Sequence, residues 1–290
     1  MTPLAIGANP WIFHAHPDVV ALVVALLAGY TVAVRRWGKL FHPGRREPAA
    51  TGRQWALFVA GIASLYLALG WPVHDLGEGY LYTFHMLQHL LLGFVTPPLI
   101  LLGTPEWLGR LLLGRGALGH VYKRLSRPLL AALLFNAALA LIHWPRVVDL
   151  MLASEAAHAA IHLVFLLAAF LMWSALYSPL PELVTLSPIG RMGFLFAQTI
   201  LPTVPASFLT FGDRPLYRAY EAFPRLWGLS PLDDMQLAGL IMKIGGGLLL
   251  WSIITVMFFR WASREEAAGR LGRSDGLSES GSPSPAPWSS

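Results

Sequence analysis

Two pairs of histidines with the same spacing are the side chains of this sequence best suited to chemistry. His85 and His89 stand four positions apart in "HMLQHLLLGF", and His158 and His162 repeat the interval in "EAAHAAIH". Residues i and i+4 of a helix share one face, with Cβ atoms about 6 Å apart. Neutral imidazole is a ligand of zinc, copper, iron and nickel. Two such pairs on neighbouring helices therefore predict a metal or cofactor site.

Four further candidate donors accompany the pairs. His143 ends an apolar run, "LDDMQLAG" offers the carboxylate of Asp234 and the thioether of Met235, and Met86 directly follows His85. Thioether sulfur favours Cu(I). The predicted metal ligands are His85, His89, His143, His158, His162 and Asp234, with Met86 and Met235 as additional candidates.

A purely structural role is the competing interpretation of each histidine. A single histidine inside a membrane helix more often makes an interhelical hydrogen bond than binds a metal. Two spaced pairs and a fifth histidine at one depth favour a site, because ionisable groups within a membrane are usually functional. His14, His16 and His74 are expected to face solvent, although a flexible His-x-His could capture metal transiently. Most of the methionines are expected to serve only in hydrophobic contacts.

The composition defines the elements that must position these residues. Of the 290 residues, 55% are hydrophobic and only 13% are charged, whereas a soluble domain is about one quarter charged. A helix needs roughly 20 apolar residues to span a membrane, and lipid offers no partner to backbone polar groups. We therefore expect an all-α integral membrane protein with a bundle of seven transmembrane helices. The predicted spans are about 17–36, 53–71, 80–102, 128–144, 155–177, 189–211 and 234–261.

Basic residues orient this predicted bundle. Lys and Arg crowd the first and third connections and the segment after the last span, whereas the second, fourth and sixth connections mix bases with acids. Because Lys and Arg concentrate on the cytoplasmic side, we expect the N-terminus outside and the C-terminus in the cytoplasm. Eight of the ten histidines then lie outside, with His42 and His120 as the exceptions. The net charge of +5 is therefore explained by basic residues that set the orientation in the membrane and face the lipid. No nucleic-acid partner is expected.

The rest of the chain adds few boundaries. We expect one membrane domain over residues 1–263 and a disordered cytoplasmic tail over 264–290, which is rich in Ser, Gly and Pro. The amino terminus lacks a basic run followed by a short apolar core, so we expect no cleavable signal peptide. The sequence contains no cysteine, which excludes disulfides and thiolate metal sites. Paired prolines, Pro97–Pro98 and Pro202 with Pro205, predict kinks in spans three and six. Asn136 and Gln198 are expected to link helices.

Three ordered motifs resemble the CtaG family, the polytopic assembly factors of cytochrome c oxidase. They are "HMLQHLLLGFVTPPLILLGTP", "HWPRVVDLMLASEAAHAAIHLVFLLAAFLMW" and "LSPLDDMQLAGLIM", and the likeness runs from about residue 10 to 262. The family's motif positions correspond to His85, His89, His158, His162 and Asp234, and His143 lies where the outer end of span four would place it. Lys243 and the glycines at 245–247 depart from the family pattern, which affects local helix contacts rather than the metal motif.

The resemblance implies a role in forming active haem–copper oxidase. The expected function is to bind copper on the extracytoplasmic side of the plasma membrane and to deliver it to the copper centre of an oxidase subunit, after a copper donor protein has supplied it. No acid, base or nucleophile set with a substrate pocket is evident, so we expect no enzymatic activity.

Three alternatives remain from the residues alone. A seven-helix zinc hydrolase acting on a lipid would hold Zn with three histidines and Asp234. A haem carrier would take one axial histidine from span three and one from span five. A structural subunit would stabilise the oxidase without touching metal.

Overall fold

The computed structural model describes residues 9–41 and 48–279, and every regular element among them is helical. His42 lies outside the described residues. The helices, with π-helical and 3-10 segments marked η, are α1 Pro17–Val32, η1 Ala33–Trp37, α2 Gly38–Phe41, α3 Gly52–Leu69, α4 Val73–Gly79, α5 Tyr82–Leu90, η2 Leu91–Val95, α6 Thr96–Gly103, α7 Glu106–Leu113, α8 Gly116–Leu125, α9 Pro128–Ile142, α10 Pro145–Ala153, α11 Glu155–Ser174, η3 Pro181–Leu183, α12 Pro188–Ile200, α13 Thr203–Thr210, η4 Arg218–Ala222, α14 Pro231–Leu240, η5 Ile241–Gly245 and α15 Gly246–Glu279.

Local sequence signals explain where several helices begin. Thr51 and Gln54 form a reciprocal capping box at the start of α3, and Ser230 and Asp233 form another at the start of α14. The hydroxyl of Ser154 accepts from the backbone of Ala157 at the start of α11. These side chains satisfy backbone N–H groups that have no partner within the helix. Two of the helices that carry predicted ligands, α11 and α14, therefore start at a residue fixed by the sequence.

The double proline shapes the helix that carries His85 and His89. Pro97 has no N–H, so the carbonyl of Gly93, four residues earlier, lacks its normal helical donor. That carbonyl instead accepts a hydrogen bond of 2.8 Å from the indole of Trp173 on α11. The surrounding turn, η2, is π-helical. The predicted irregularity in span three is confirmed, and it ties the two histidine-bearing helices together.

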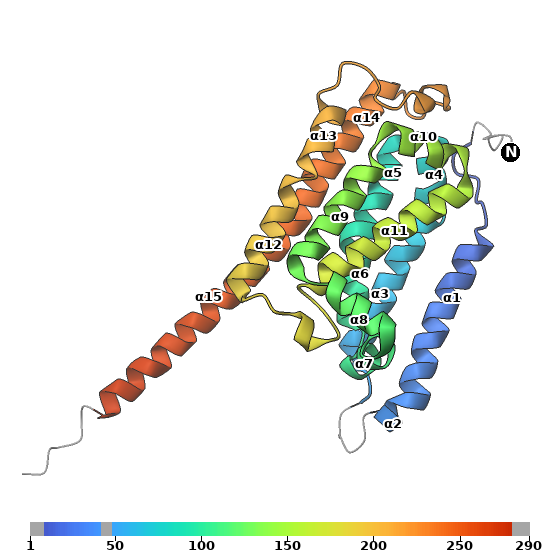
Figure 1. The fold of residues 1–290 in the computed structure, drawn as a ribbon. Coiled ribbons are helices and arrows are strands. Elements are labelled where there is room, and N and C mark those ends of the chain that lie inside the picture. The colour runs from blue at the N-terminus through green and yellow to red at the C-terminus, as the bar shows by residue number, and fades with distance from the viewer. Residues whose placement is uncertain (1–8, 42–47, 280–290) are drawn as a thin grey trace, which may run out of the picture.

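The helices form a bundle (Figure 1), and two of its buried clusters lie next to the histidines. In the middle, α3 lies against α6, and α11 lies against α9 and α6, while α1 flanks α3 and the pair α12 and α15 packs on the other side. One buried cluster, centred on Phe135, Phe165 and Trp173, fills the middle of the bundle. A second, with Tyr82, Met86 and Met151, lies at the end near α4, α10 and α14. The histidines lie between the two clusters.

Six helical segments are long and apolar enough to cross a membrane. The fourth predicted span, 128–144, corresponds to α9, whose 15 residues cover only about 22 Å. It reaches spanning length only together with α8, from which it is bent by 83°. The described residues thus contain six spans, or seven if this bent pair counts as one.

Two smaller predictions concern span six. It breaks between α12 and α13 at Leu201 and Pro202, as the prolines predict. The amide of Asn136 on α9 donates to the amide oxygen of Gln198 on α12 at 2.7 Å, so the predicted polar link between helices is confirmed. This bond holds α12 against the bundle below the histidines.

Helix α15 continues beyond the membrane segment to Glu279. For residues 264–279 the structure therefore has a helix where the sequence predicts disorder, and residues 280–290 lie outside the described residues. The division of the chain at residue 263 stays a prediction.

Candidate metal centre

Four buried histidines from two helices form what we call the histidine core: His85 and His89 on α5, and His158 and His162 on α11. One ring nitrogen each from His85, His158 and His162 lies within 4.8 Å of the others. The Nε2 atoms of His89 and His162 are 2.8 Å apart. None of the four residues exposes more than 4% of its surface. The four-residue spacing has therefore placed both pairs on facing helix surfaces, as the sequence predicts.

Hydrogen bonding within the protein does not satisfy these rings. Neither ring nitrogen of His85 has a protein partner, nor has Nδ1 of His89, Nδ1 of His162 or Nε2 of His158. A buried polar atom without a partner is destabilising by about 1–3 kcal/mol. A cation bound by lone pairs from several rings would satisfy these nitrogens together, so the donor set fits a metal ion.

His143 extends the core with a sulfur ligand. Its Nδ1 lies 2.6 Å from the carbonyl oxygen of Leu139, to which it must donate, so Nε2 carries the free lone pair. That Nε2 faces the sulfur of Met86 at 3.4 Å, and the His143 and His89 rings are 5.5 Å apart. Two facing lone-pair donors, one of them a thioether, suit a soft cation.

A neighbouring tyrosine fixes the position of His143. The hydroxyl of Tyr217 donates to the carbonyl of His143 at 2.9 Å. Burial raises the pKa of Tyr217 to about 12. The hydroxyl therefore keeps its proton at any physiological pH and remains a donor.

Asp234 occupies a different environment from the imidazoles. Its carboxylate is fully buried and accepts from the backbone N–H of Tyr82 and Thr83 at 2.8 and 2.9 Å, and from the Thr83 hydroxyl at 2.7 Å. Helix α5 has no side-chain cap of its own, so Asp234 on α14 caps it from outside. Among the described residues, the groups of convergent imidazole and carboxylate ligands do not include Asp234. Its role as a ligand stays a prediction, and its contacts are those of a positioning residue.

The sulfur of Met235 contacts the backbone of another segment rather than an imidazole of the core. Its sulfur lies 3.1 Å from the backbone nitrogen of Leu216 and 3.5 Å from that of Tyr217. It therefore holds the segment that follows α13. Of the two methionines singled out from the sequence, only Met86 faces an imidazole.

Helix α4 carries His74, which the sequence predicts to face solvent. His74 keeps only 21% of its side-chain surface exposed, so this expectation is wrong, and its neighbour Asp75 keeps only 12%. Glu78 Oε1 is 2.6 Å from Nδ1 of His158, a close contact that is not aligned as a hydrogen bond. These side chains are partly buried because α4 packs closely on α5 at Gly77, where an added Cβ would lie 2.9 Å from the backbone nitrogen of His85. This absence of a side chain allows α4 to lie directly on α5.

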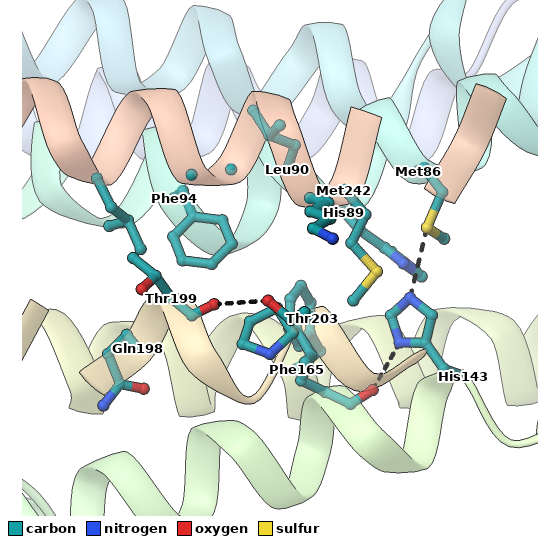
Figure 2. Close-up of a pocket in the computed structure, with 16 residues that line it drawn as sticks. Met86, His89, Leu90, Phe94, His143, Phe165, Gln198, Thr199, Thr203 and Met242 are labelled. Carbon is teal, nitrogen blue, oxygen red and sulfur yellow. Dashed lines mark hydrogen bonds between the residues drawn. The ribbon is translucent and has the colours of Figure 1, made fainter. Parts of the chain in front are cut away.

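A pocket begins at the inner side of the core (Figure 2). Figure 2 shows His143 with dashed contacts to Met86 and to a backbone oxygen, and His89 and Met242 nearby. Lys243 also lines the pocket, and its ammonium is 5.8 Å from the centre of the Phe211 ring. A cation–π contact of this kind helps to accommodate a charge in an apolar setting.

Comparisons with known proteins agree with the resemblance. A family model described as cytochrome c oxidase caa3 assembly factor matches residues 28–264. Uncharacterized proteins of Mycobacterium bovis and Mycobacterium tuberculosis are each 25% identical over 278 residues, which is 85% of this chain and 38% of theirs. The chain thus spans less than half the length of these curated relatives. No solved structure matches. Since the family model covers most of the chain, including every histidine of the core, this protein belongs to the Caa3_CtaG family of cytochrome c oxidase caa3 assembly factors.

Proposed function

We propose that this protein binds one copper ion at the histidine core and passes it to the copper centre of a haem–copper oxidase subunit in the plasma membrane. The observation that carries the proposal is the convergence of His85, His158 and His162, with both ring nitrogens of His85 buried and without a protein partner. The family supplies the context of oxidase assembly.

The chemistry of the donors favours copper, and Cu(I) in particular. The core offers neutral imidazoles, and the adjacent pair of His143 and Met86 adds a thioether, which selects Cu(I). Burying a charge is costly, and a monovalent ion carries less charge into this site than a divalent one. In this proposal copper is cargo that must be released again. Neutral donors bind the ion without forming a permanent ion pair with it.

The alternatives have weaker support in the geometry. The zinc hydrolase needs Asp234 beside three histidines, whereas its carboxylate oxygens accept from the amino end of α5. The haem carrier needs a porphyrin between the two helices, whereas His89 and His162 are only 2.8 Å apart at Nε2.

Elemental analysis of detergent-purified protein tests the proposal. Wild-type protein reconstituted with Cu(I) should hold about one copper per chain, and the His85→Ala/His89→Ala variant should hold none. The matched control is His120→Ala, because His120 is exposed on α8 and its ring is hydrogen-bonded to the backbone carbonyl of Gly116. Zinc in place of copper in wild type would support the hydrolase. Equal loss of copper in the control would contradict a site in the histidine core.

A further inference from the structure

A second group of metal-binding side chains lies beside the histidine core. We call His16, His74 and Asp75 the outer group, because they are only partly buried and their ligand atoms lie within 4.8 Å of one another. Nε2 of His16 is 2.6 Å from one oxygen of Asp75, and Nδ1 of the exposed His14 is 3.0 Å from the other. His14 and His16 precede the residues matched by the family model, whereas His74 and Asp75 lie within them.

A third group, which we call the middle group, connects the outer group to the histidine core. His74, Glu78 and His158 also hold their ligand atoms within 4.8 Å of one another. Glu78 Oε1 is 3.5 Å from Nε2 of His74 and 2.6 Å from Nδ1 of His158. His74 therefore belongs to the outer and the middle group, and His158 belongs to the middle group and the core.

Six imidazole rings lie one after another through these groups, in a row that we call the file. The centres of the His16 and His74 rings are 5.1 Å apart, and those of His74 and His158 are 5.6 Å apart. From His158 the next ring, His162, is at 4.2 Å, and His89 follows at 5.0 Å. The last step is the 5.5 Å from His89 to His143. The longest of these distances between ring centres is 5.6 Å.

Burial and charge change in one direction along the file. The exposed fraction of the side chain is 55% for His14, 22% for His16 and 6% for His158. The outer and middle groups each contain a carboxylate, whereas the group in the histidine core, His85, His158 and His162, contains only imidazoles. Negative charge at the mouth of a cleft raises the local concentration of cations, and neutral soft donors at its end suit retention of Cu(I).

We propose that the outer group is a loading site, from which copper reaches the histidine core by ligand exchange through His74, Glu78 and His158. This inference rests on the proposed function of the core. Because successive groups share a histidine, the ion exchanges one ligand at a time and is never released to solvent. The ion keeps its oxidation state throughout, and each step breaks one metal–ligand bond as another forms.

The rate of copper uptake tests the loading site separately from storage. Cu(I) is presented under reducing conditions as its complex with bicinchoninate, and the loss of the chelate colour is followed by stopped flow. The variant is His16→Gln/Asp75→Asn, and His120→Gln is the control away from the path. We expect the variant to reach the wild-type end point but at a rate lower by about tenfold or more, because it lacks two of the three side chains that would first take the ion from the chelate.

The outcomes separate the loading path from the proposed function. Asp75→Glu retains the charge and should retain most of the wild-type rate, which would show that the slow variant is not merely misfolded. Uptake by the double variant at the wild-type rate would overturn the path while leaving the core intact. A lost end point would also overturn it, because the outer residues would then belong to storage. If wild type takes up no copper, the proposed function itself fails.

Discussion

At the scale of single residues, Asp234 anchors the helix that carries His85 and His89. It fixes the first turn of α5, whose Tyr82 and Thr83 N–H groups would otherwise be buried without partners. We expect Asp234→Ala to lower the free energy of unfolding by about 3 kcal/mol or more. Thermal unfolding in detergent measures this loss. Copper bound per folded chain at low temperature should stay near the wild-type value.

Asp234→Asn is the matched variant, because its amide oxygen still accepts one of the two N–H groups. It should fall between wild type and Asp234→Ala in stability. A stable Asp234→Ala protein that has lost its copper would instead make Asp234 a direct ligand, as its position in the sequence predicts.

Glu78 is the carboxylate that lies against the histidine core. Its oxygen lies beside Nδ1 of His158, and carboxylates next to metal-binding histidines typically change metal affinity by 10- to 100-fold. We expect Glu78→Gln to weaken Cu(I) binding by roughly 10- to 100-fold, measured by competition with a chelator. Glu182→Gln is the control, because Glu182 pairs with Arg110 and Lys123 far from α4. Equal affinities of Glu78→Gln and wild type would contradict a role for this carboxylate.

At the scale of helices, one hydrogen bond links α11 to η2, the π-helical turn that continues α5. The indole of Trp173 reaches the carbonyl of Gly93 that Pro97 leaves free. We expect Trp173→Phe, which keeps an aromatic ring but removes the donor, to lower the free energy of unfolding by about 1–3 kcal/mol. Trp251→Phe is the control, because Trp251 is half exposed on α15. Unfolding of both variants at the same temperature would mean that this bond does not hold the helices.

The sequence predicted these elements unequally, for physical reasons. The spacing of His85 with His89 and of His158 with His162 predicted shared helix faces, because helical periodicity is a local property. The partner of Gly93 could not be predicted, since Trp173 is 80 residues away. Helix α4 was missed because a segment of seven residues with two glycines has little helical tendency of its own. It is helical because Gly77 lets it lie on α5.

At the scale of the whole molecule, the metal donors lie at one end, where bases are mixed with acids, and the connections crowded with Lys and Arg lie at the other. The end with α4, α10 and α14 holds the outer group and the core, whereas α2, α7 and α8 lie at the other end (Figure 1). The latter elements carry or adjoin Arg36, Arg110 and Lys123. Because Lys and Arg concentrate on the cytoplasmic side, we infer that the histidine end faces outward. Copper would then be loaded and delivered outside the cytoplasm.

The absence of cysteine from the sequence allows a direct test of this orientation. Single cysteines would replace the exposed Ala222 in η4 at the histidine end and the exposed Ala117 in α8 at the basic end. In intact cells, a membrane-impermeant maleimide should label Ala222→Cys and spare Ala117→Cys, and both should react once the membrane is permeabilised. The reverse pattern would place the histidine end in the cytoplasm. The loading site would then draw on cytoplasmic copper, and delivery outside would require the ion to cross the membrane.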